Sequence, residues 1–393
     1  MEIRLIDYQS TTAAGVDIDA LRRAIDTQQS GLRLNDLPLC DIATWIGRVD
    51  GLEQMDLGPW QSRNNALAAM GLNQGSILAQ LEQLKEKYTP SRIGLVMGSS
   101  TASIDRTEEG YRNIDEDGRL TPAYRQALVH NPHSPSLFVA HTTGITGPAM
   151  TINTACSSSA KVFASAARWL QLGLVDAVLV GGVDTLCLSV MYGFHSLQLV
   201  SENPCRPFDQ ARDGINLGEA AGFAILMRPS DAEEGAGVSL FGFGESSDAH
   251  HMSHPHPEGL GARLAMQQAL DMADLPSDSI DYINLHGTAS KANDLIEGKL
   301  VEAMFPKTTK VSSTKAWMGH TLGAAGITEA LIAVDGLRRN IIPGSLNLSQ
   351  LDDQLALNID SNNSNVPLNY VMSNSFGFGG NNCSLLFGMS GDA

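Results

Sequence analysis

The sequence predicts an α/β protein with a mainly parallel β-sheet, assembled from two halves of similar pattern. Short apolar runs of buried-strand length alternate with longer segments of helical periodicity, an order that is typical of βαβ units. This alternation occurs on both sides of residues 229–237, a segment rich in Pro, Asp, Glu and Gly that is the best linker in the chain. In each half, one predicted helix opens with small residues after a short polar loop, which suggests a duplication.

The first half begins with a short strand and then carries three longer strand runs. We expect strands at residues 3–7, 92–97, 176–182 and 220–227, because these runs are short and mostly apolar. Helices are expected at residues 17–27, 64–84 (broken near Gly71) and 157–172. Residues 33–60 lack regular patterning. Residues 101–135 are polar and show no core pattern, so we expect an insertion, a lid or a subunit contact there.

The second half repeats the alternation of strand and helix. Its strands are expected at residues 238–244, 280–285, 309–313, 369–374 and 382–388. Its helices are expected at residues 259–273, 293–304 and 321–339. We therefore divide the chain into residues 1–235 and 236–393.

Composition and charge exclude several classes of function. The 393 residues, 43% of them hydrophobic, can form two domains or one large double layer. A net charge of −17 without any basic run argues against nucleic-acid binding. The five cysteines are scattered without a CxxC pair, which indicates neither a disulfide framework nor a zinc site. Since no signal-peptide pattern opens the chain and no apolar run approaches the ~20 residues of a membrane span, we expect a cytoplasmic enzyme without membrane contact.

The clearest chemical signal is Asn153–Ala160, where Cys156 stands among very small residues. The mostly apolar run Ala149–Ile152 precedes it and the predicted helix 157–172 follows, so Cys156 is expected at a strand-to-helix turn, at the helix N-terminus. There the free N–H groups favour a thiolate, with a pKa lowered from ~8.5 to between ~3.5 and ~7.5, and can bind an oxyanion. A buried structural cysteine is the plainer alternative, but the small neighbours keep a substrate path open.

Two histidines stand at the ends of predicted elements in the second half. His286 directly follows a strand, at the position where α/β folds place ligands. His320 stands at the start of the predicted helix 321–339, beside very small residues. Each alone is more often structural, but together with Cys156 they fit the logic of a nucleophile and its bases. A cysteine protease pairs one His with Asn or Asp, so two histidines match that class poorly.

Two further patterns point to other chemistry and are weaker. A His-rich tract next to Asp248 has the composition of a metal site, but its spacing fits no helix or strand and its prolines indicate a loop. We therefore favour a polar active-site loop and expect no metal; the tract comprises His250, His251, His254 and His256. Residues 377–380 are glycine-rich but lack dinucleotide-binding spacing, and no Walker A sequence exists.

Together these residues resemble the β-ketoacyl-[acyl carrier protein] synthases, the ketosynthases of the thiolase superfamily. The matching pieces run in family order over roughly residues 140–388, and their combination is far more specific than any single piece. They are Thr154–Ser157, Arg206–Asp209 with Arg212–Gly214, Ser246–Ala249 with His251–Met252, His286–Thr288 with Asn293–Asp294, Lys315 with Gly319–His320, Gly323–Glu329, and Asn374–Gly380. The residues before 140 match far less clearly.

The resemblance implies a five-layered α-β-α-β-α thiolase fold made from two duplicated halves, residues 1–235 with the nucleophile and 236–393 with both catalytic histidines. It implies that Cys156 takes an acyl chain from phosphopantetheine. His286 and His320 then hold the carbonyl of malonyl-acyl carrier protein and stabilise the enolate that forms as carbon dioxide leaves. The product is a 3-oxoacyl-acyl carrier protein, in fatty acid or in polyketide or polyene biosynthesis. Phosphopantetheine arrives on the carrier protein, so no resident cofactor is expected.

Further residues receive roles from the same resemblance. Lys315 completes the catalytic set, and with Glu329 it forms a pair that orients the histidines. The backbone N–H groups of Cys156 and Phe378 are the expected oxyanion hole, and Phe378 is the expected gate between the acyl pocket and the malonyl site. Thr288 and Ser290 are expected on pantetheine. The whole expected substrate-binding set is Phe378, Phe376, Thr288, Ser290, Glu329, Asp248 and Arg206.

The chain departs from the family pattern in ways that suggest a specialised branch. Ala289-Ser290-Lys291 follows Thr288 where the family often has a threonine and a proline, and Asn381 replaces a threonine after the double glycine. The Val-Thr-Gly opening of the family is missing.

The carrier-protein surface departs from the pattern as well. The basic residues expected near Pro135 are replaced by Asn131, His133 and Ser134. Because carrier proteins and this chain are both acidic, a local basic patch is needed. Its candidates are Arg63, Arg206 and Lys161, with Arg206 the strongest by motif.

Two other functions fit the same fold. A non-catalytic chain-length factor typically lacks the active cysteine, so Cys156, His286 and His320 argue against that function. A coenzyme A thiolase needs a second catalytic cysteine, but Cys383 lies outside a Cys-x-Gly setting and inside a predicted strand. We expect a homodimer, or a heterodimer with a ketosynthase-like chain-length factor.

Overall fold

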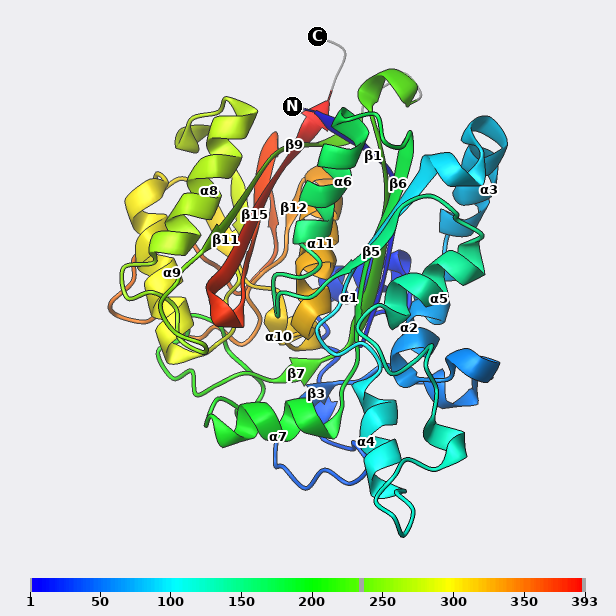
Figure 1. Ribbon diagram of the computed structural model, residues 1–393. Coiled ribbons are helices and arrows are strands. Elements are labelled where there is room, and N and C mark those ends of the chain that lie inside the picture. Colours follow the sequence, from blue (N-terminus) through cyan, green and yellow to red (C-terminus); the bar gives the residue numbers. More distant parts are fainter. Residues whose placement is uncertain (1, 233–236, 391–393) are drawn as a thin grey trace.

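The computed structural model describes residues 2–232 and 237–390, and Figure 1 shows its architecture. Part of the predicted linker 229–237, with the predicted boundary between residues 235 and 236, lies outside the described residues. The main sheet has the strand order β11-β10-β14-β15-β9-β1-β8-β6-β4-β5. Its strands are β1 (Ile3–Thr12), β4 (Ile93–Gly98), β5 (Ala149–Ile152), β6 (Ala177–Asp184), β8 (Ala220–Met227), β9 (Gly237–Ser247), β10 (Tyr282–Asn284), β11 (Lys310–Ser312), β14 (Tyr370–Phe376) and β15 (Asn381–Ser390).

Helices connect most of these strands, and side-chain caps fix where several helices begin. Asp17 accepts the Ala20 N–H at 2.6 Å at the start of the first helix, and Ser62 accepts the Asn65 N–H at 3.1 Å at the start of the second. The α-helices are α1 (Ile18–Asp26), α2 (Arg63–Leu72), α3 (Ile77–Tyr88), α4 (Ile104–Arg112), α5 (Ser134–Thr143), α6 (Lys161–Gln171), α7 (Leu188–Ser196), α8 (Leu260–Ala273), α9 (Lys291–Met304), α10 (Lys315–Met318) and α11 (Ala325–Arg339). Short strand pairs complete the fold: β2 (Arg33–Leu34), β3 (Trp45–Gly47) and β7 (Leu217–Gly218) in one sheet, and β12 (Ile341–Ile342) with β13 (Ser364–Asn365) in another.

Three helical layers and two sheet layers alternate across the molecule. In Figure 1, α8 and α9 cover the outer face of the strands from the second half. Helices α2, α3 and α5 cover the outer face of the strands from the first half. Between the two sheet layers lie α6 and α11. The predicted five-layered α-β-α-β-α arrangement is therefore confirmed.

The sheet is mixed, so the prediction of a mainly parallel sheet is wrong. Parallel pairing is confined to β6-β4-β5 in one half and β14-β10-β11 in the other. The remaining pairs are antiparallel, β6-β8-β1 and β14-β15-β9 in the two halves and β1-β9 between them. A short connection such as residues 377–380 between β14 and β15 has no room for a crossover and forces antiparallel pairing. Both halves thus follow one pairing pattern.

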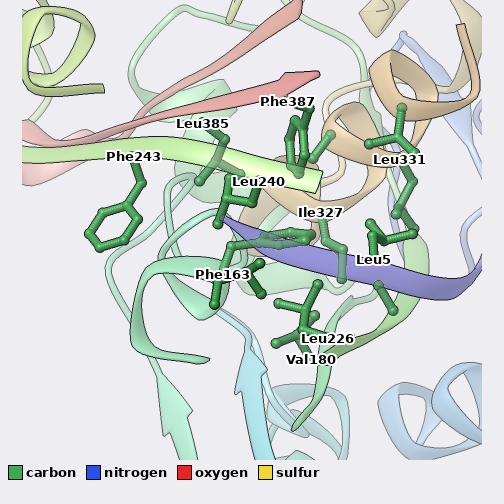
Figure 2. Close-up of a cluster of buried hydrophobic side chains, with 14 of the residues drawn as sticks. Leu5, Phe163, Val180, Leu226, Leu240, Phe243, Ile327, Leu331, Leu385 and Phe387 are labelled. Atoms are coloured by element: carbon green, nitrogen blue, oxygen red, sulfur yellow. The ribbon is translucent and has the colours of Figure 1, made fainter. Parts of the chain in front are cut away.

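The two halves share one apolar core around α6 and α11 (Figure 2). Phe163 of α6 and Phe387 of β15 pack edge to face with ring centroids 5.6 Å apart. Ile327 of α11 belongs to the same cluster. Backbones approach closely here, since a Cβ added to Gly222 of β8 would lie 2.8 Å from Ile327 Cγ2. Such contacts explain why this chain combines 38 glycines with only 6% aromatic residues.

Several element boundaries differ from the sequence prediction. β1 continues past residue 7 to Thr12, although its last four residues, 9–12, are polar and buried. α4 forms within residues 101–135, where no core pattern was visible, and it buries only Gly110.

None of the helices within residues 2–232 and 237–390 is long and apolar enough to cross a lipid bilayer.

Truncating the Phe163–Phe387 contact in the central layer is expected to lower the stability of the protein strongly. Phe163→Ala leaves a cavity between the halves and is expected to lower the free energy of unfolding by about 3–5 kcal/mol. Leu172→Ala, just past the end of the same helix and 72% exposed, is the control and is expected to change it by less than about 0.5 kcal/mol. Urea unfolding midpoints measure both, and equal shifts would contradict the shared core.

Candidate active site

Cys156 lies in a tight turn between β5 and α6. Ala155, directly before it, has a φ of +53°, in the left-handed region that is costly for a residue with a Cβ. Hydroxyl groups hold the turn: Ser157 Oγ donates to the Thr154 carbonyl at 2.9 Å, and Ser158 Oγ donates to the Ala155 carbonyl at 2.6 Å. A strained backbone that its surroundings enforce is typical of a functional position, and this one turns the thiol toward a cavity.

Two expectations for Cys156 are wrong. The helix begins at Lys161, with turns over residues 157–160, so Cys156 is not in its first turn. Burial raises the pKa of the Cys156 thiol to about 11, although the Lys315 ammonium and the donating N–H of Phe378 lower that pKa. Desolvation of a buried thiolate therefore outweighs the Lys315 charge and the Phe378 N–H. The resting side chain is a neutral thiol.

His320 is in hydrogen-bond contact with this thiol. It follows α10 through Gly319, whose φ of +80° turns the chain out of the helix. The His320 N–H donates to the Asn216 carbonyl at 2.7 Å, and the His320 carbonyl accepts the Gly218 N–H at 3.0 Å. These backbone bonds fix the residue so that His320 Nε2 lies 3.0 Å from Cys156 Sγ. A neutral imidazole nitrogen at this distance can accept the thiol proton.

His286 lies at the carboxyl end of β10, and Glu297 of α9 holds its backbone. The Glu297 carboxylate accepts the N–H groups of His286 and Gly287, each at 2.8 Å. Lys315 Nζ donates to the His286 carbonyl at 2.6 Å. Burial raises the pKa of Glu297 to about 7, and the two backbone donors limit that rise. Sequence reasoning missed Glu297, because it is one of three acidic residues in α9 and nothing in the sequence sets it apart from the other two.

The two imidazoles are neutral and face each other. Burial lowers the pKa of His286 and of His320 well below the usual value, and the Lys315 ammonium lowers both further. The rings are 5.4 Å apart and nearly perpendicular, at 84°. One ligand atom of each ring and Cys156 Sγ all lie within 4.8 Å of one another. Since a neutral imidazole carries one N–H donor, both rings can donate to an oxygen near the sulfur.

Lys315 and Glu329 form a buried ion pair behind the histidines. Lys315 Nζ donates to Glu329 Oε1, and the two side chains are only 1% and 5% exposed. Burial raises the pKa of Glu329 to about 6, while Lys315 lowers it. Neither residue lines the cavity. The pair contacts His286 through the bond from Lys315 Nζ to the His286 carbonyl, on the side away from the cavity lining.

A cavity of about 410 Å³ opens onto Cys156, His286 and His320. Of the predicted substrate-binding residues, Glu329 and Arg206 do not line it. Those that do are Phe376, Phe378, Thr288, Ser290 and Asp248.

Sequence reasoning missed the contribution of α7 and the residues after it. Phe194 stacks on Phe378 with ring centroids 5.4 Å apart and an interplanar angle of 29°. Leu197, Gln198 and Leu199 also line the cavity. The available signal was a largely apolar helix that buries only Met191, because apolar side chains at a surface often mark a ligand contact.

The three candidates for a basic patch differ in availability. Arg63 is held by the fully buried Glu219 and by Glu53, so it is a structural residue and not a free surface cation. Lys161 Nζ lies 3.8 Å from Glu245. Arg206 forms no ion pair within the described part of the chain, and its Nε is buried without a hydrogen-bond partner there.

Metal binding has one geometric candidate. Among residues 2–232 and 237–390, the only group of at least three His, Cys, Asp or Glu side chains that could hold a metal ion is Cys156, His286 and His320. A metal would have to displace the proton of a thiol whose pKa is about 11. In the His-rich loop, only His251 and His254 bring ring nitrogens into contact, with Nδ1 atoms 3.2 Å apart.

A nucleophilic thiol, a base in contact with it and two neutral N–H donors at one end of a cavity are suited to covalent acyl transfer. The thiol supplies the covalent bond, and the donors stabilise negative charge on a carbonyl oxygen. The N–H of Phe378, which donates to the thiol, is placed to do the same for an oxygen on an acylated sulfur.

Comparison with known proteins is consistent with this chemistry. Residues 62–232 match the family profile "Beta-ketoacyl synthase, N-terminal domain", and residues 238–349 match "Beta-ketoacyl synthase, C-terminal domain". The chain is 31% identical over 397 residues to 3-oxoacyl-[acyl-carrier-protein] synthase 2 of Vibrio harveyi, covering 95% of each chain.

Two solved structures extend the likeness to the whole fold. One is the ketosynthase ApeO in complex with its chain length factor ApeC from Xenorhabdus doucetiae, with a TM-score of 0.88, 35% identity and coverage of 99% of this chain and 98% of that one. The other is a β-ketoacyl synthase from Burkholderia phymatum, with a TM-score of 0.87, 27% identity and 99% coverage of both chains.

The buried ion pair predicts a stability defect that depends on pH. Lys315→Met leaves the Glu329 carboxyl buried without its cation, so its pKa in the folded variant rises further above the ordinary 4.5. The defect is therefore small near pH 5 and grows as the pH rises to 8, reaching about 3–5 kcal/mol. Melting temperatures at both pH values measure it. The double variant Lys315→Met/Glu329→Gln should lose the pH dependence, and a defect of equal size at both pH values would contradict the assignment.

Proposed function

The chain belongs to the β-ketoacyl synthase family, and from that premise we propose how its residues perform the reaction. The enzyme catalyses decarboxylative condensation of an acyl group, held on Cys156, with malonyl-acyl carrier protein to give 3-oxoacyl-acyl carrier protein. The reaction serves fatty acid or polyketide synthesis. One observation carries the residue roles: His320 Nε2 lies 3.0 Å from Cys156 Sγ, with His286 beside both.

In the first step, Cys156 sulfur attacks the thioester carbonyl of the acyl-carrier protein. Since the pKa of the thiol is about 11, the thiol proton passes to His320 Nε2 as the carbon–sulfur bond forms, without a preformed thiolate. The backbone N–H groups of Phe378 and Cys156 bind the oxyanion. When the intermediate collapses, the phosphopantetheine sulfur leaves and takes the proton back from His320.

In the second step, His286 and His320 donate hydrogen bonds to the thioester oxygen of the malonyl group; for this step the N–H of His320 moves from Nδ1, where acylation leaves it, to Nε2. The bond to the malonyl carboxylate breaks, carbon dioxide leaves, and its bonding electrons form an enolate whose charge the two N–H groups stabilise. The enolate carbon attacks the acyl carbonyl on Cys156. Collapse releases the 3-oxoacyl product and a Cys156 thiolate, which takes a proton from solvent.

The neutral state of both imidazoles is essential to this step, and Lys315 maintains it. Its ammonium lowers the pKa of both rings, after burial, and its bond to the His286 carbonyl fixes one of them. Glu329 neutralises the buried ammonium. Lys315 and Glu329 are therefore positioning residues for the histidines.

Phosphopantetheine reaches the sulfur along the cavity. Thr288 Oγ1 donates to Ser290 Oγ at 3.0 Å, so a pair of hydroxyl groups faces the arm, with Ser290 in place of the family's second threonine. Phe378 acts as the gate, because it is stacked on Phe194 in a loop whose Gly379 and Gly380 have positive φ values of 76° and 74°. Phe376 lines the same passage near His286.

A second ketosynthase-like chain pairs with this one at the β5 edge. β5 ends the main sheet, its residues are at least partly exposed, and its free edge carries unpaired backbone groups. Leu137 of the neighbouring α5 is 43% exposed. The partner is a second copy or a chain-length factor, and the ApeO structure contains a ketosynthase with such a factor.

The two alternative functions lose support from the same geometry. A chain-length factor does not need a nucleophile, yet here Cys156 is paired with His320. A thiolase needs a second cysteine at the site, but Cys383 is fully buried in β15 and does not line the cavity.

Acylation of Cys156 is the direct test. Wild-type protein mixed with acyl-carrier proteins should gain the mass of one acyl group, and adding malonyl-carrier protein should yield a ketoacyl product two carbons longer. Cys156→Ala should show neither by intact-mass spectrometry. Acylation only after a chain-length factor is added would identify the heterodimer, and an adduct on Cys156→Ala would refute the assigned nucleophile.

Assaying acylation and decarboxylation separately distinguishes the roles proposed for His286 and His320. His286→Ala should still be acylated but should decarboxylate malonyl-carrier protein ~10²–10³-fold more slowly, because one oxyanion donor is lost. His320→Ala should lose both acylation and decarboxylation, and Cys156→Ala should retain decarboxylation. Release of labelled carbon dioxide measures the second reaction, with His133→Ala, an exposed histidine, as the control. Normal acylation of His320→Ala would contradict its role as base.

A further inference from the structure

A second hollow lies on the surface between α8 and α9, which run side by side in Figure 1. Its volume is about 290 Å³, and its lining combines apolar and charged side chains. Leu295, Ile296 and Leu300 of α9 form the apolar part, and Arg263 of α8 and Lys299 of α9 supply two cations. We call this hollow the α8–α9 groove.

The α8–α9 groove adjoins the entrance of the active-site cavity. Ser253, His254 and Pro255 line the cavity, and Pro257 and Glu258 of the same loop line the groove. The first turn of α9 connects them too, since residues 291–293 line the cavity and residues 295–296 line the groove. A partner whose flexible arm lies along this loop and the first turn of α9 is therefore brought close to the groove.

The cations of the groove are free to bind a partner. Arg263, Lys299 and the neighbouring Lys291 are exposed and form no ion pair within the described part of the chain. Glu258 is the one carboxylate in the groove lining. Two cations beside one carboxylate therefore give the groove lining a local excess of positive charge, in a chain whose net charge is −17.

We propose that the α8–α9 groove docks the acidic carrier protein, an inference that rests on the proposed ketosynthase function. An acidic helix laid across the groove places carboxylates against Arg263 and Lys299 and apolar side chains against Leu295 and Ile296. Leu260 and Leu264, which are 48% and 44% exposed on α8, extend the apolar contact. Without local cations, two acidic proteins repel each other at long range, so the groove also speeds their encounter.

The cations of the α8–α9 groove stand in for basic residues that this chain lacks near Pro135. The positions near Pro135 where basic residues are expected carry Asn131, His133 and Ser134. Of the three candidate cations in that half, Arg63 is held by Glu219 and Glu53, Lys161 Nζ lies 3.8 Å from Glu245, and only Arg206 forms no ion pair within the described part of the chain. The carrier protein therefore has free cations available beside the cavity entrance in the second half.

Charge reversal tests the groove. Arg263→Glu/Lys299→Glu is compared with Lys307→Glu, an exposed cation beyond the far end of α9 that has no described ion pair. Each protein is assayed for acylation of Cys156 by an acyl-carrier protein and by the same acyl group on free pantetheine. The double variant should lose at least tenfold in kcat/KM with the carrier substrate, mainly through KM, and lose nothing with the pantetheine thioester. Lys307→Glu should match wild type with both.

The salt dependence of KM and a pair of conservative substitutions provide two further tests of the groove. KM of the wild type for the acyl-carrier protein should rise with ionic strength, and that dependence should weaken in the double variant. Arg263→Lys/Lys299→Arg should restore near-normal KM. Unchanged kcat/KM with the carrier substrate, or an equal loss with free pantetheine, would overturn the docking site. Failure of the wild type with both substrates would instead overturn the proposed function.

Discussion

The site depends on one buried cation, the ammonium of Lys315, in the interior of a protein that provides a single carboxylate to neutralise it. Glu329 supplies that carboxylate, and the remaining donor capacity goes to the carbonyl of His286. Burial lowers the pKa of both imidazoles, and the nearby Lys315 charge lowers the pKa of each further. The proposed decarboxylation step needs two uncharged N–H donors, and burial together with Lys315 favours that state of both rings.

The second requirement is that catalytic groups from two halves of the chain meet. Small residues make that contact possible: a Cβ on Gly326 of α11 would lie 2.4 Å from Ala160 N, and one on Gly98 would lie 2.5 Å from Ser159. Since α11 and the Cys156 turn touch backbone to backbone, the loop that carries His320 comes within hydrogen-bond reach of the thiol. This close backbone packing requires small residues, which agrees with the many glycines and few aromatic residues of the chain.

Much of the fold and of the site could be predicted, because hydrophobic periodicity and the order of motifs can be seen in the sequence itself. The strand at 220–227 and the order of elements in the second half agree with the structure, and the resemblance selected the three residues that meet in the cavity. Strand direction and the polar end of β1 were missed, because periodicity carries no direction and buried polar residues resemble loop residues. The thiol pKa and the pairing of Arg63 were predicted wrongly, since both depend on three-dimensional surroundings.

A resting thiol with a raised pKa also determines what the enzyme does not react with. Peroxides and small electrophiles attack the thiolate, and their rates follow thiolate population and exposure. Cys156 is only 5% exposed and burial raises the pKa of its thiol to about 11, so little thiolate is present for these agents to attack. In the proposed mechanism, the sulfur becomes nucleophilic only while a thioester occupies the cavity and His320 can take its proton. The active-site cysteine is thereby protected from oxidative damage between turnovers by the same desolvation that delays its ionisation.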